Sequence, residues 1–319
     1  MVIILAAFVF LCLFKCKINK SGINNNYLGF DNSIAIKGLF AVVVMLHHIT
    51  NEADCGKFMF LFNFSGFIAV SVFFFYSGYG LMYSYTNKEN YLNGFVKKRI
   101  SKILLPYIII VLIYSIVKII IDKMTITQIL MTFVNGYPVA DYSWFVIAIM
   151  ILYAFFFIAF KICKNQNSAI LLLSAFVIIY SCIASYLNFG SPVIAFLLGI
   201  YWKKFDKRIL ANVSKNYSLY LIALSALFFI TFASYHLIAD SELYLIINAL
   251  LFVSVVMVLQ MKIKINNVML RFLGKISFEI YMIHGLYIYL LKKIDIFANN
   301  SLLFFARRSC YVNSFGIDT

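Results

Sequence analysis

Long runs of apolar residues, separated by short polar or basic segments, follow one another along nearly the whole chain. The runs lack the alternation of apolar and polar residues that strands of a membrane β-barrel show. Backbone groups in hydrocarbon must be paired internally and a spanning helix needs ~20 apolar residues, so we predict about ten helical spans. They cover residues 1–14, 34–50, 62–85, 103–121, 143–160, 168–187, 190–202, 217–237, 243–260 and 276–291. The predicted fold class is therefore all-α, a polytopic transmembrane helix bundle.

The composition agrees with this pattern, since 64% of the residues are hydrophobic and 12% are charged. Soluble domains carry about 25% charged residues, which excludes a soluble fold here. The apolar runs recur without a long polar linker, and this indicates one membrane domain at 34–293. An anchor helix and basic loop at 1–33 precede it, because the first run lacks the charged start and cleavage site of a signal peptide. A short tail at 294–319 follows.

Basic residues fall in alternate loops between the predicted spans, which accounts for most of the net charge of +15. The loops on one side hold Lys15, Lys17, Lys20, Lys97, Lys98, Arg99, Lys102, Lys161, Lys164, Lys203, Lys204, Lys207, Arg208, Lys262, Lys264, Arg271 and Lys275. The loops on the other side hold mainly Lys57 and Lys123. By the positive-inside rule the first side is cytoplasmic. Loop placement and attraction to anionic membrane lipids explain the basic balance, so a nucleic-acid partner is excluded.

The cysteines give no sign of a disulfide framework or a metal site. Cys12, Cys16, Cys55, Cys163, Cys182 and Cys310 show no paired spacing. Cys16 and Cys163 also fall on the predicted cytoplasmic side, where thiols stay reduced. We therefore predict neither a disulfide nor a bound metal.

The second apolar run carries ionisable residues, and a charge at the bilayer centre costs ~3 kcal/mol or more. Lys37 and His48 are eleven positions apart, which places them ~16 Å apart along the helix axis and on nearly one face. His47 points ~100° away from His48. This face can present a cation near one membrane surface and a base near the other. Alternatively, Lys37 extends to the interface along its own stem and the histidines lie among lipid headgroups.

Five segments in order carry a resemblance to a known family. They are Lys37 followed after ten residues by His48, the aromatic segment Phe73–Tyr79, the basic segment Phe95–Tyr107 with its proline, Tyr142–Phe145, and Phe272–His284. Together they resemble the acyltransferase-3 family of membrane O-acyltransferases. The resemblance implies transfer of an acyl group, expected to be acetyl, from acyl-CoA to a hydroxyl of a cell-envelope polysaccharide or glycolipid. It also implies a bacterial source, so the multi-pass protein is expected in the bacterial cytoplasmic membrane.

Two departures from the family pattern affect these expectations. Lys37 stands where the family usually has arginine, which keeps the charge and loses the two-point hydrogen-bonding geometry of a guanidinium. After Lys293 the family continues into another span, whereas this chain offers only Ser301–Phe305 before a polar tail. This predicts a truncated product, and an inactive family member stays open as an alternative.

Acyl transfer to a hydroxyl needs a base to take the hydroxyl proton and a cation or dipole to hold the developing oxyanion charge. We assign the base to His48, because neutral imidazole accepts a proton near ambient pH. Lys37 is expected along the route of the thioester. Glu52 follows His48 by one helical turn, where its carboxylate could fix the tautomer of the ring. A simply solvated Glu52 near the helix end is the alternative.

The resemblance implies that acyl-CoA approaches from the cytoplasm, and its phosphates need cationic partners. Arg99, Lys98 and Lys102 lie in the basic loop on that side and are the predicted CoA-binding residues. Alternatively, these residues only set the topology and contact lipid phosphates.

Four further residues are assigned to substrate binding, namely Ser77, Trp144, Glu279 and His284. Ser77 belongs to a Ser-Gly step, which is more often a notch that lets helices approach closely. His284 falls in the outer half of its span and is expected to line the acceptor cavity. Glu279 and His284 could instead form a satisfied polar pair inside the bundle.

Two other functions fit part of the pattern. A transporter or flippase for a glycan or small solute would also carry isolated charges inside its spans. Against it, the sequence shows no obvious inverted repeat with paired broken helices. A non-catalytic membrane scaffold is the other alternative, and the short C-terminal segment is its best support.

Overall fold

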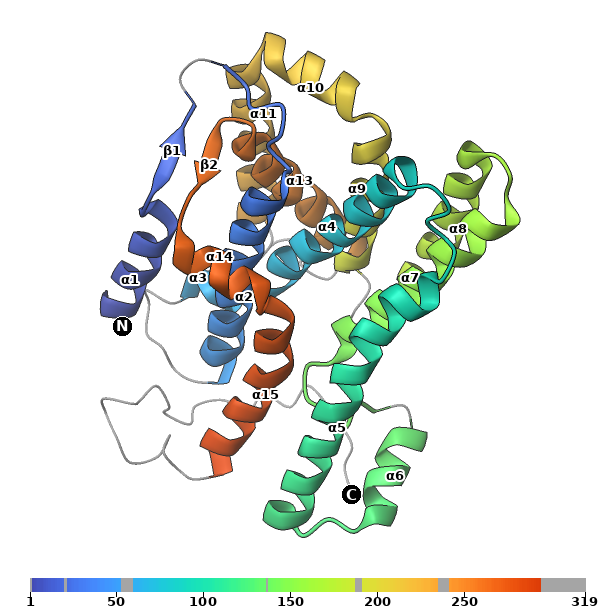
Figure 1. Cartoon of the computed structure of the whole chain (residues 1–319). Helices are drawn as coiled ribbons and strands as arrows, with labels where there is room; N and C mark the ends of the chain where they lie inside the picture. The colour runs from blue at the N-terminus through green and yellow to red at the C-terminus, as the bar shows by residue number, and fades with distance from the viewer. Residues whose placement is uncertain are drawn as a thin grey trace.

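The computed structural model describes residues 2–19, 22–52, 60–135, 137–186, 191–234 and 241–293, and most of them are helical (Figure 1). The helices are α1 (Val2–Leu13), α2 (Phe30–Glu52), α3 (Phe60–Asn63), α4 (Gly66–Asn87), η2 (Val96–Ile100), α5 (Ser101–Asp122), α6 (Ile126–Val134), α7 (Trp144–Ile162), α8 (Gln166–Tyr186), η3 (Ser191–Ile194), α9 (Ala195–Lys204), α10 (Asp206–Lys215), α11 (Tyr217–Ala233), α13 (Glu242–Gln260), α14 (Val268–Lys275) and α15 (Ser277–Lys293). Lys20, Lys57, Cys55, Cys310 and the predicted tail lie outside the described residues.

Within the described residues, six helices are long and apolar enough to cross a membrane, which indicates a multi-pass integral membrane protein. They are α2, α4, η2 joined to α5, α7, α8 and α13. A seventh is reached if α10 and α11, which meet at a bend of 102°, count as one span. The predicted count of about ten is not confirmed.

The difference in count has a physical reason in helix length. Helices α1, α9 and α15 have 12, 10 and 17 residues. At 1.5 Å per residue they reach roughly 18, 15 and 26 Å, short of the ~30 Å hydrocarbon core. Each of the three occupies a predicted span without being long enough by itself to cross.

Two helix crossings fix the centre of the bundle, and both depend on glycine. A Cβ placed on Gly38 of α2 would lie 2.0 Å from a backbone oxygen of α14, and one on Gly274 of α14 would lie 1.8 Å from a backbone oxygen of α2. Gly78 of α4 and Gly199 of α9 approach each other's helices in the same way, at 2.1 and 2.2 Å. Backbones can come this close only where side chains are missing, as is typical of packed membrane helices.

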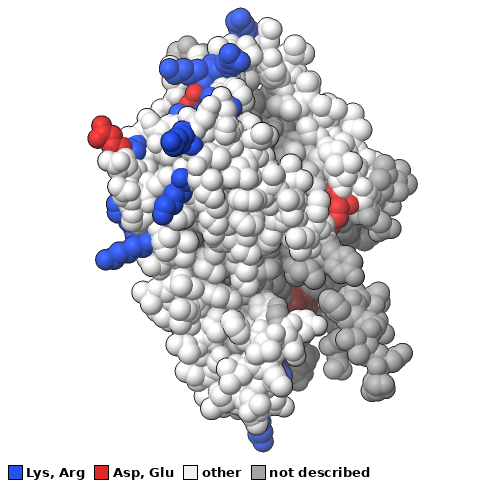
Figure 2. Space-filling model, turned by 90° about the vertical axis from the view of Figure 1, so that its right-hand side faces the viewer, with Lys and Arg blue, Asp and Glu red and all other residues white. Residues whose placement is uncertain are grey.

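Short strands, which the sequence did not predict, close one end of the bundle. Strand β1 (Cys16–Ile18) pairs antiparallel with β2 (Ile263–Ile265), joining the segment after α1 to the segment after α13. We call this end, with β1, β2, α10 and η2, the basic end, and the opposite end, with α6 and the last turn of α15, the distal end. Figure 2 shows Lys and Arg gathered in the upper part of one face, above a broad region with few charged side chains.

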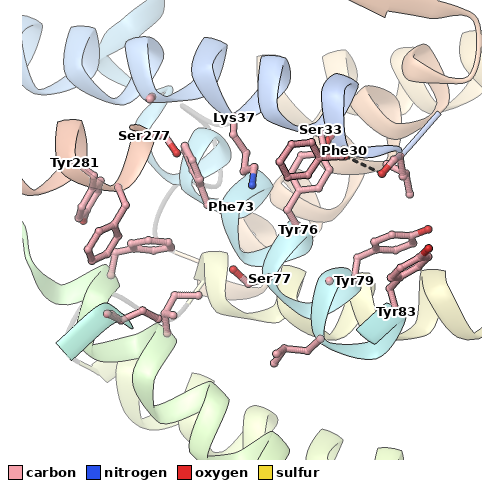
Figure 3. Close-up of a pocket in the computed structure, with 18 of the residues that line it drawn as sticks. Phe30, Ser33, Lys37, Phe73, Tyr76, Ser77, Tyr79, Tyr83, Ser277 and Tyr281 are labelled. Carbon is pink, nitrogen blue, oxygen red and sulfur yellow. Dashed lines mark hydrogen bonds between the residues drawn. The ribbon is translucent and has the colours of Figure 1, made fainter. Parts of the chain in front are cut away.

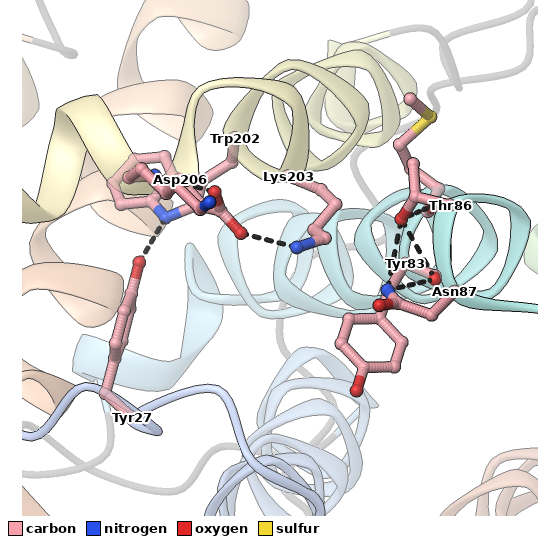
Figure 4. Close-up of polar contacts among 9 residues, drawn as sticks. Tyr27, Tyr83, Thr86, Asn87, Trp202, Lys203 and Asp206 are labelled. Atoms are coloured by element: carbon pink, nitrogen blue, oxygen red, sulfur yellow. Dashed lines mark hydrogen bonds and ion pairs between the residues drawn. The ribbon is translucent and has the colours of Figure 1, made fainter.

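Side-chain hydrogen bonds hold the basic end together. Trp202 of α9 donates its indole N–H to the hydroxyl of Tyr27 at 2.6 Å, and burial raises the pKa of Tyr27 to about 12. Lys203 pairs with Asp206 at 2.5 Å (Figure 4). These contacts tie α9 and α10 to the segment that leads into α2, and therefore fix where α2 begins.

The distal end is held by two adjacent lysines at the end of α15. Lys292 pairs with Glu52 of α2, and Lys293 pairs with Asp122 of α5 at 2.6 Å. Since these carboxylates belong to different helices, α15 connects α2 to α5 at this end, as the placement of the three helices in Figure 1 also shows.

Candidate active site

A cavity of about 830 Å³ lies inside the bundle, walled mainly by α2, α4, α7 and α15. Near the basic end its wall includes Lys88 and Arg99, together with the residues just before α2. On α15 the wall runs from Ser277 to His284. Figure 3 shows the part of the cavity between α2 and α4, with side chains from both helices pointing into it. The cavity thus has a cationic end and an end that carries an imidazole.

Lys37 points into this cavity from α2 (Figure 3). Its neighbours on the wall include the hydroxyls of Ser33, Ser77 and Ser277. Among the described residues, no carboxylate forms an ion pair with Lys37. An ammonium group held inside a membrane protein without a counter-ion attracts an anionic or strongly polar ligand, because its desolvation is otherwise uncompensated.

Arg99 is the one of the three predicted CoA-binding cations that lines the cavity. Its Nε donates to the hydroxyl of Tyr91 at 2.9 Å, and Nη2 donates to Ser84 at 3.2 Å. A guanidinium has five N–H donors, so these two bonds leave others for an anionic group. Lys98 and Lys102 are exposed and lie outside the cavity wall.

His284 lines the cavity from α15 and is only 5% exposed. Its Nδ1 lies 2.6 Å from the backbone oxygen of Tyr281. A carbonyl oxygen can only accept, so Nδ1 carries a hydrogen and the lone pair of the neutral ring is on Nε2. Nε2 is buried and has no hydrogen-bond partner among the described residues. A buried nitrogen of this kind is a candidate for proton transfer.

His48 packs against His284 with ring centroids 5.0 Å apart and planes inclined by 29°. It is partly exposed and does not itself line the cavity. His47, the other histidine of the pair in sequence, contacts the ring of His48 at 4.9 Å and faces Phe62, whose backbone oxygen lies 2.9 Å from its Nδ1. Besides this neighbour in sequence, His48 thus meets His284, which lies 236 positions away in sequence (284 minus 48).

Glu52 lies one helical turn beyond His48, but its carboxylate interacts with side chains other than the imidazole. Its carboxylate accepts a hydrogen bond from the hydroxyl of Tyr142 at 2.8 Å and pairs with Lys292. The ring of Tyr142 in turn lies 4.0 Å from the ring of His48. Glu52 is therefore connected to His48 through Tyr142, whereas the sequence suggested direct contact with the imidazole.

The remaining predicted substrate-binding residues fall in three different surroundings. Ser77 lines the cavity from α4, beside the glycine crossing with α9. Trp144 does not line the cavity; its ring packs against the rings of Phe74 and Phe145, with centroids 6.3 and 6.4 Å away. Glu279 is exposed and lies outside the cavity wall. Of the predicted site residues, the structure thus brings Lys37, Ser77, Arg99 and His284 together around the cavity.

Sequence reasoning missed Tyr142 and Tyr281. Tyr142 lies in the loop before α7 and contacts both imidazole rings, and Tyr281 donates its hydroxyl to the backbone oxygen of Tyr142 at 2.5 Å. The only available signal was their position inside the matched segments at 142–145 and 272–284. Within the described part of the chain, no three His, Cys, Asp or Glu residues come close enough to hold a metal ion.

Comparison with known protein families gives a match over most of the chain. The model of a family described as Acyltransferase domain matches residues 28–307 and thus includes every helix that walls the cavity. No curated protein and no solved structure matches the chain.

Proposed function

Because the chain belongs to this acyltransferase-3 family, we propose that it transfers an acyl group, expected to be acetyl, from acyl-CoA to a hydroxyl of a cell-envelope polysaccharide or glycolipid. The protein is a multi-pass membrane acyltransferase. The donor, the acceptor and a location in the bacterial cytoplasmic membrane are the finer parts of the proposal. One observation carries it: a single cavity is lined by the ammonium of Lys37, which forms no ion pair in the described part of the chain, and by His284, which packs against His48.

The donor enters from the basic end. There Arg99 offers N–H donors to the phosphates of CoA, and the exposed Lys98 and Lys102 attract them from solution. The pantetheine arm then extends into the cavity toward Lys37. An ammonium beside the thioester favours the transition state, because negative charge develops on the carbonyl oxygen during attack.

The acceptor hydroxyl comes from the distal side, where His48 is partly exposed. The hydroxyl oxygen attacks the thioester carbonyl carbon, and the imidazole of His48 takes the hydroxyl proton. The carbon–sulfur bond then breaks, and the proton passes to the sulfur of the leaving thiolate. The products are an ester and free CoA, with no change in oxidation state. His284 holds the reacting groups next to His48, while Ser77 contributes to the wall that holds the donor.

A direct assay tests the proposal. The protein, purified in detergent and returned to liposomes, is incubated with radiolabelled acetyl-CoA and a cell-envelope extract. We expect label in carbohydrate or glycolipid that mild alkali releases, since alkali cleaves oxygen esters. The same incubation of labelled acetyl-CoA and extract without the protein serves as the blank. Movement of a glycan or solute across the liposome without any transfer of label would instead establish a transporter and contradict the proposal.

A further inference from the structure

Tyr142 has an uncommon backbone conformation next to the imidazole pair. Its φ is +61°, in the left-handed region that costs a non-glycine residue about 1–2 kcal/mol. Such a conformation persists when the surroundings hold it from several sides. Here the backbone oxygen of Tyr142 accepts a hydrogen bond from the hydroxyl of Tyr281 at 2.5 Å. The hydroxyl of Tyr142 itself donates a hydrogen bond to the carboxylate of Glu52 at 2.8 Å. The residue is thus fixed at both its backbone and its side-chain end.

The ring of Tyr142 lies against both histidines. Its centroid is 4.0 Å from that of His48 and 5.5 Å from that of His284, and the two histidine rings are 5.0 Å apart. A Cβ placed on Gly285 would lie 2.9 Å from the tyrosine ring, so the ring also packs directly against the backbone of α15. The three rings form one contact group, in which Tyr142 restricts the orientations open to both imidazoles.

His48 depends on this contact more than His284 does. The backbone oxygen of Tyr281 orients the ring of His284, whereas no hydrogen bond to the ring of His48 is recorded within the described residues. Among these residues, the orientation of the His48 ring is therefore limited by the side chains that pack against it. The contacts of His48 are aromatic ones, and its shortest ring distance is the one to Tyr142.

The hydroxyl of Tyr142 fixes the ring itself. It binds Glu52, which pairs with Lys292 and so joins α2 to α15, the helices that carry His48 and His284. Burial and the neighbouring carboxylate raise the pKa of Tyr142 above its ordinary value. The hydroxyl therefore stays protonated at neutral and moderately alkaline pH and keeps donating to Glu52.

We propose that Tyr142 is a positioning residue for acyl transfer, whose ring holds the imidazoles of His48 and His284 in a reactive arrangement. This inference rests on the function proposed above and deepens it. Tyr142 itself exchanges no proton and forms no covalent bond in the reaction. Loss of the ring should therefore reduce the rate of the chemical step and leave binding of the donor in place, because the donor-binding cations lie toward the other end of the cavity.

The experiment compares Tyr142→Phe, Tyr142→Leu and Tyr142→Asn in the labelled-acetyl transfer assay, with kcat and the donor KM measured for each. Phenylalanine keeps the ring, whereas leucine and asparagine remove it, and asparagine tolerates positive φ better than leucine does. We expect the two ring-deleting variants to lose about 10- to 100-fold in kcat, as misplacement of reacting groups by about 1 Å does, with donor KM within about twofold. Tyr142→Phe should keep most of the activity.

Matched controls come from Tyr137, which is 65% exposed and, like Tyr142, lies in the segment before α7. Tyr137→Phe and Tyr137→Leu should leave both constants unchanged. Thermal unfolding and gel filtration in detergent show which variants fold. If Tyr142→Leu does not fold, the kcat of Tyr142→Asn tests the inference.

Three results would overturn the inference. One is a folded ring-deleting variant with kcat within about twofold of wild type. Another is a Phe variant as impaired as the Leu variant, because the ring would then not be the element that matters. The third is failure of both ring-deleting variants to fold beside a fully active Phe variant, which makes Tyr142 structural. A wild-type protein that transfers no label is a different outcome, since it refutes the proposed function itself.

Discussion

Replacing Lys37 by methionine separates function from stability at a single position. The ammonium lines the cavity without a carboxylate partner among the described residues, so its removal takes away a charge that the bundle does not neutralise. A hydrogen bond to a charged group contributes about 1.5–3 kcal/mol, which corresponds to a loss of roughly 10- to 150-fold in kcat/KM. Methionine has a similar length and no desolvation penalty, so the melting temperature should rise.

The measurement pairs the labelled-acetyl transfer assay with thermal unfolding in the same detergent. Lys164→Met is the matched control, because Lys164 is exposed in the turn between α7 and α8 and should change neither quantity. Lys37→Arg should keep activity within a few-fold, since the charge remains and a guanidinium can bind an oxyanion at two points. A Lys37→Met protein with full activity would refute the assignment of this cation to the thioester. A lower melting temperature would refute the view that its charge is uncompensated.

Three further changes give expected outcomes. His48→Ala should reduce transfer by about 10²- to 10⁴-fold without affecting membrane insertion, measured by labelled-acetyl incorporation and membrane fractionation; full activity would dismiss His48 as the base. Arg99→Glu should raise the KM for acetyl-CoA by about tenfold or more with little change in kcat, because a charge-assisted contact becomes repulsive; an unchanged KM would remove Arg99 from the CoA site. Gly78→Ala should destabilise the fold by about 1–3 kcal/mol, since the new Cβ would lie 2.1 Å from the backbone oxygen of Phe196. Gly80→Ala, whose Cβ would meet nothing within 4 Å, should leave the melting temperature unchanged or slightly higher, because alanine favours a helix more than glycine does.

Hydrophobicity and loop charge were sufficient to predict a helical multi-pass protein. A described helix overlaps every predicted span, for example Gly66–Asn87 against 62–85. The number of crossings was less predictable, because α9 and α15 are apolar but short, and an apolar run says nothing about whether its helix crosses alone. Amphipathic helices α10 and α14 were also missed, since each lies in a segment whose lysines and arginines mark it as a loop.

The strands and the aromatic contacts depend on residues far apart in sequence. Strand β1 has three residues, and its partner β2 lies 247 positions later (Cys16 to Ile263). No local pattern identifies such a pair. For the candidate site, helical periodicity placed Lys37 and His48 on one face, but only the packing of α15 against α2 reveals that His48 meets His284. The left-handed conformation of Tyr142 has no sequence signal at all, because tyrosine rarely adopts it.

The glycine crossings also determine how the site responds to its lipid surroundings. Gly38 directly follows Lys37, and Gly78 directly follows Ser77, so each crossing holds its helix at the level of a cavity residue. A thicker or thinner bilayer changes the tilt of a helix that is free to move, at a modest free-energy difference per ångström. Here α2 and α14 tilt as one unit, and so do α4 and α9, because their backbones interlock. Because α2 also packs against α4, the depth of the Lys37 ammonium relative to the Ser77 hydroxyl is set by the protein, and the same internal spacing should persist in membranes of different thickness.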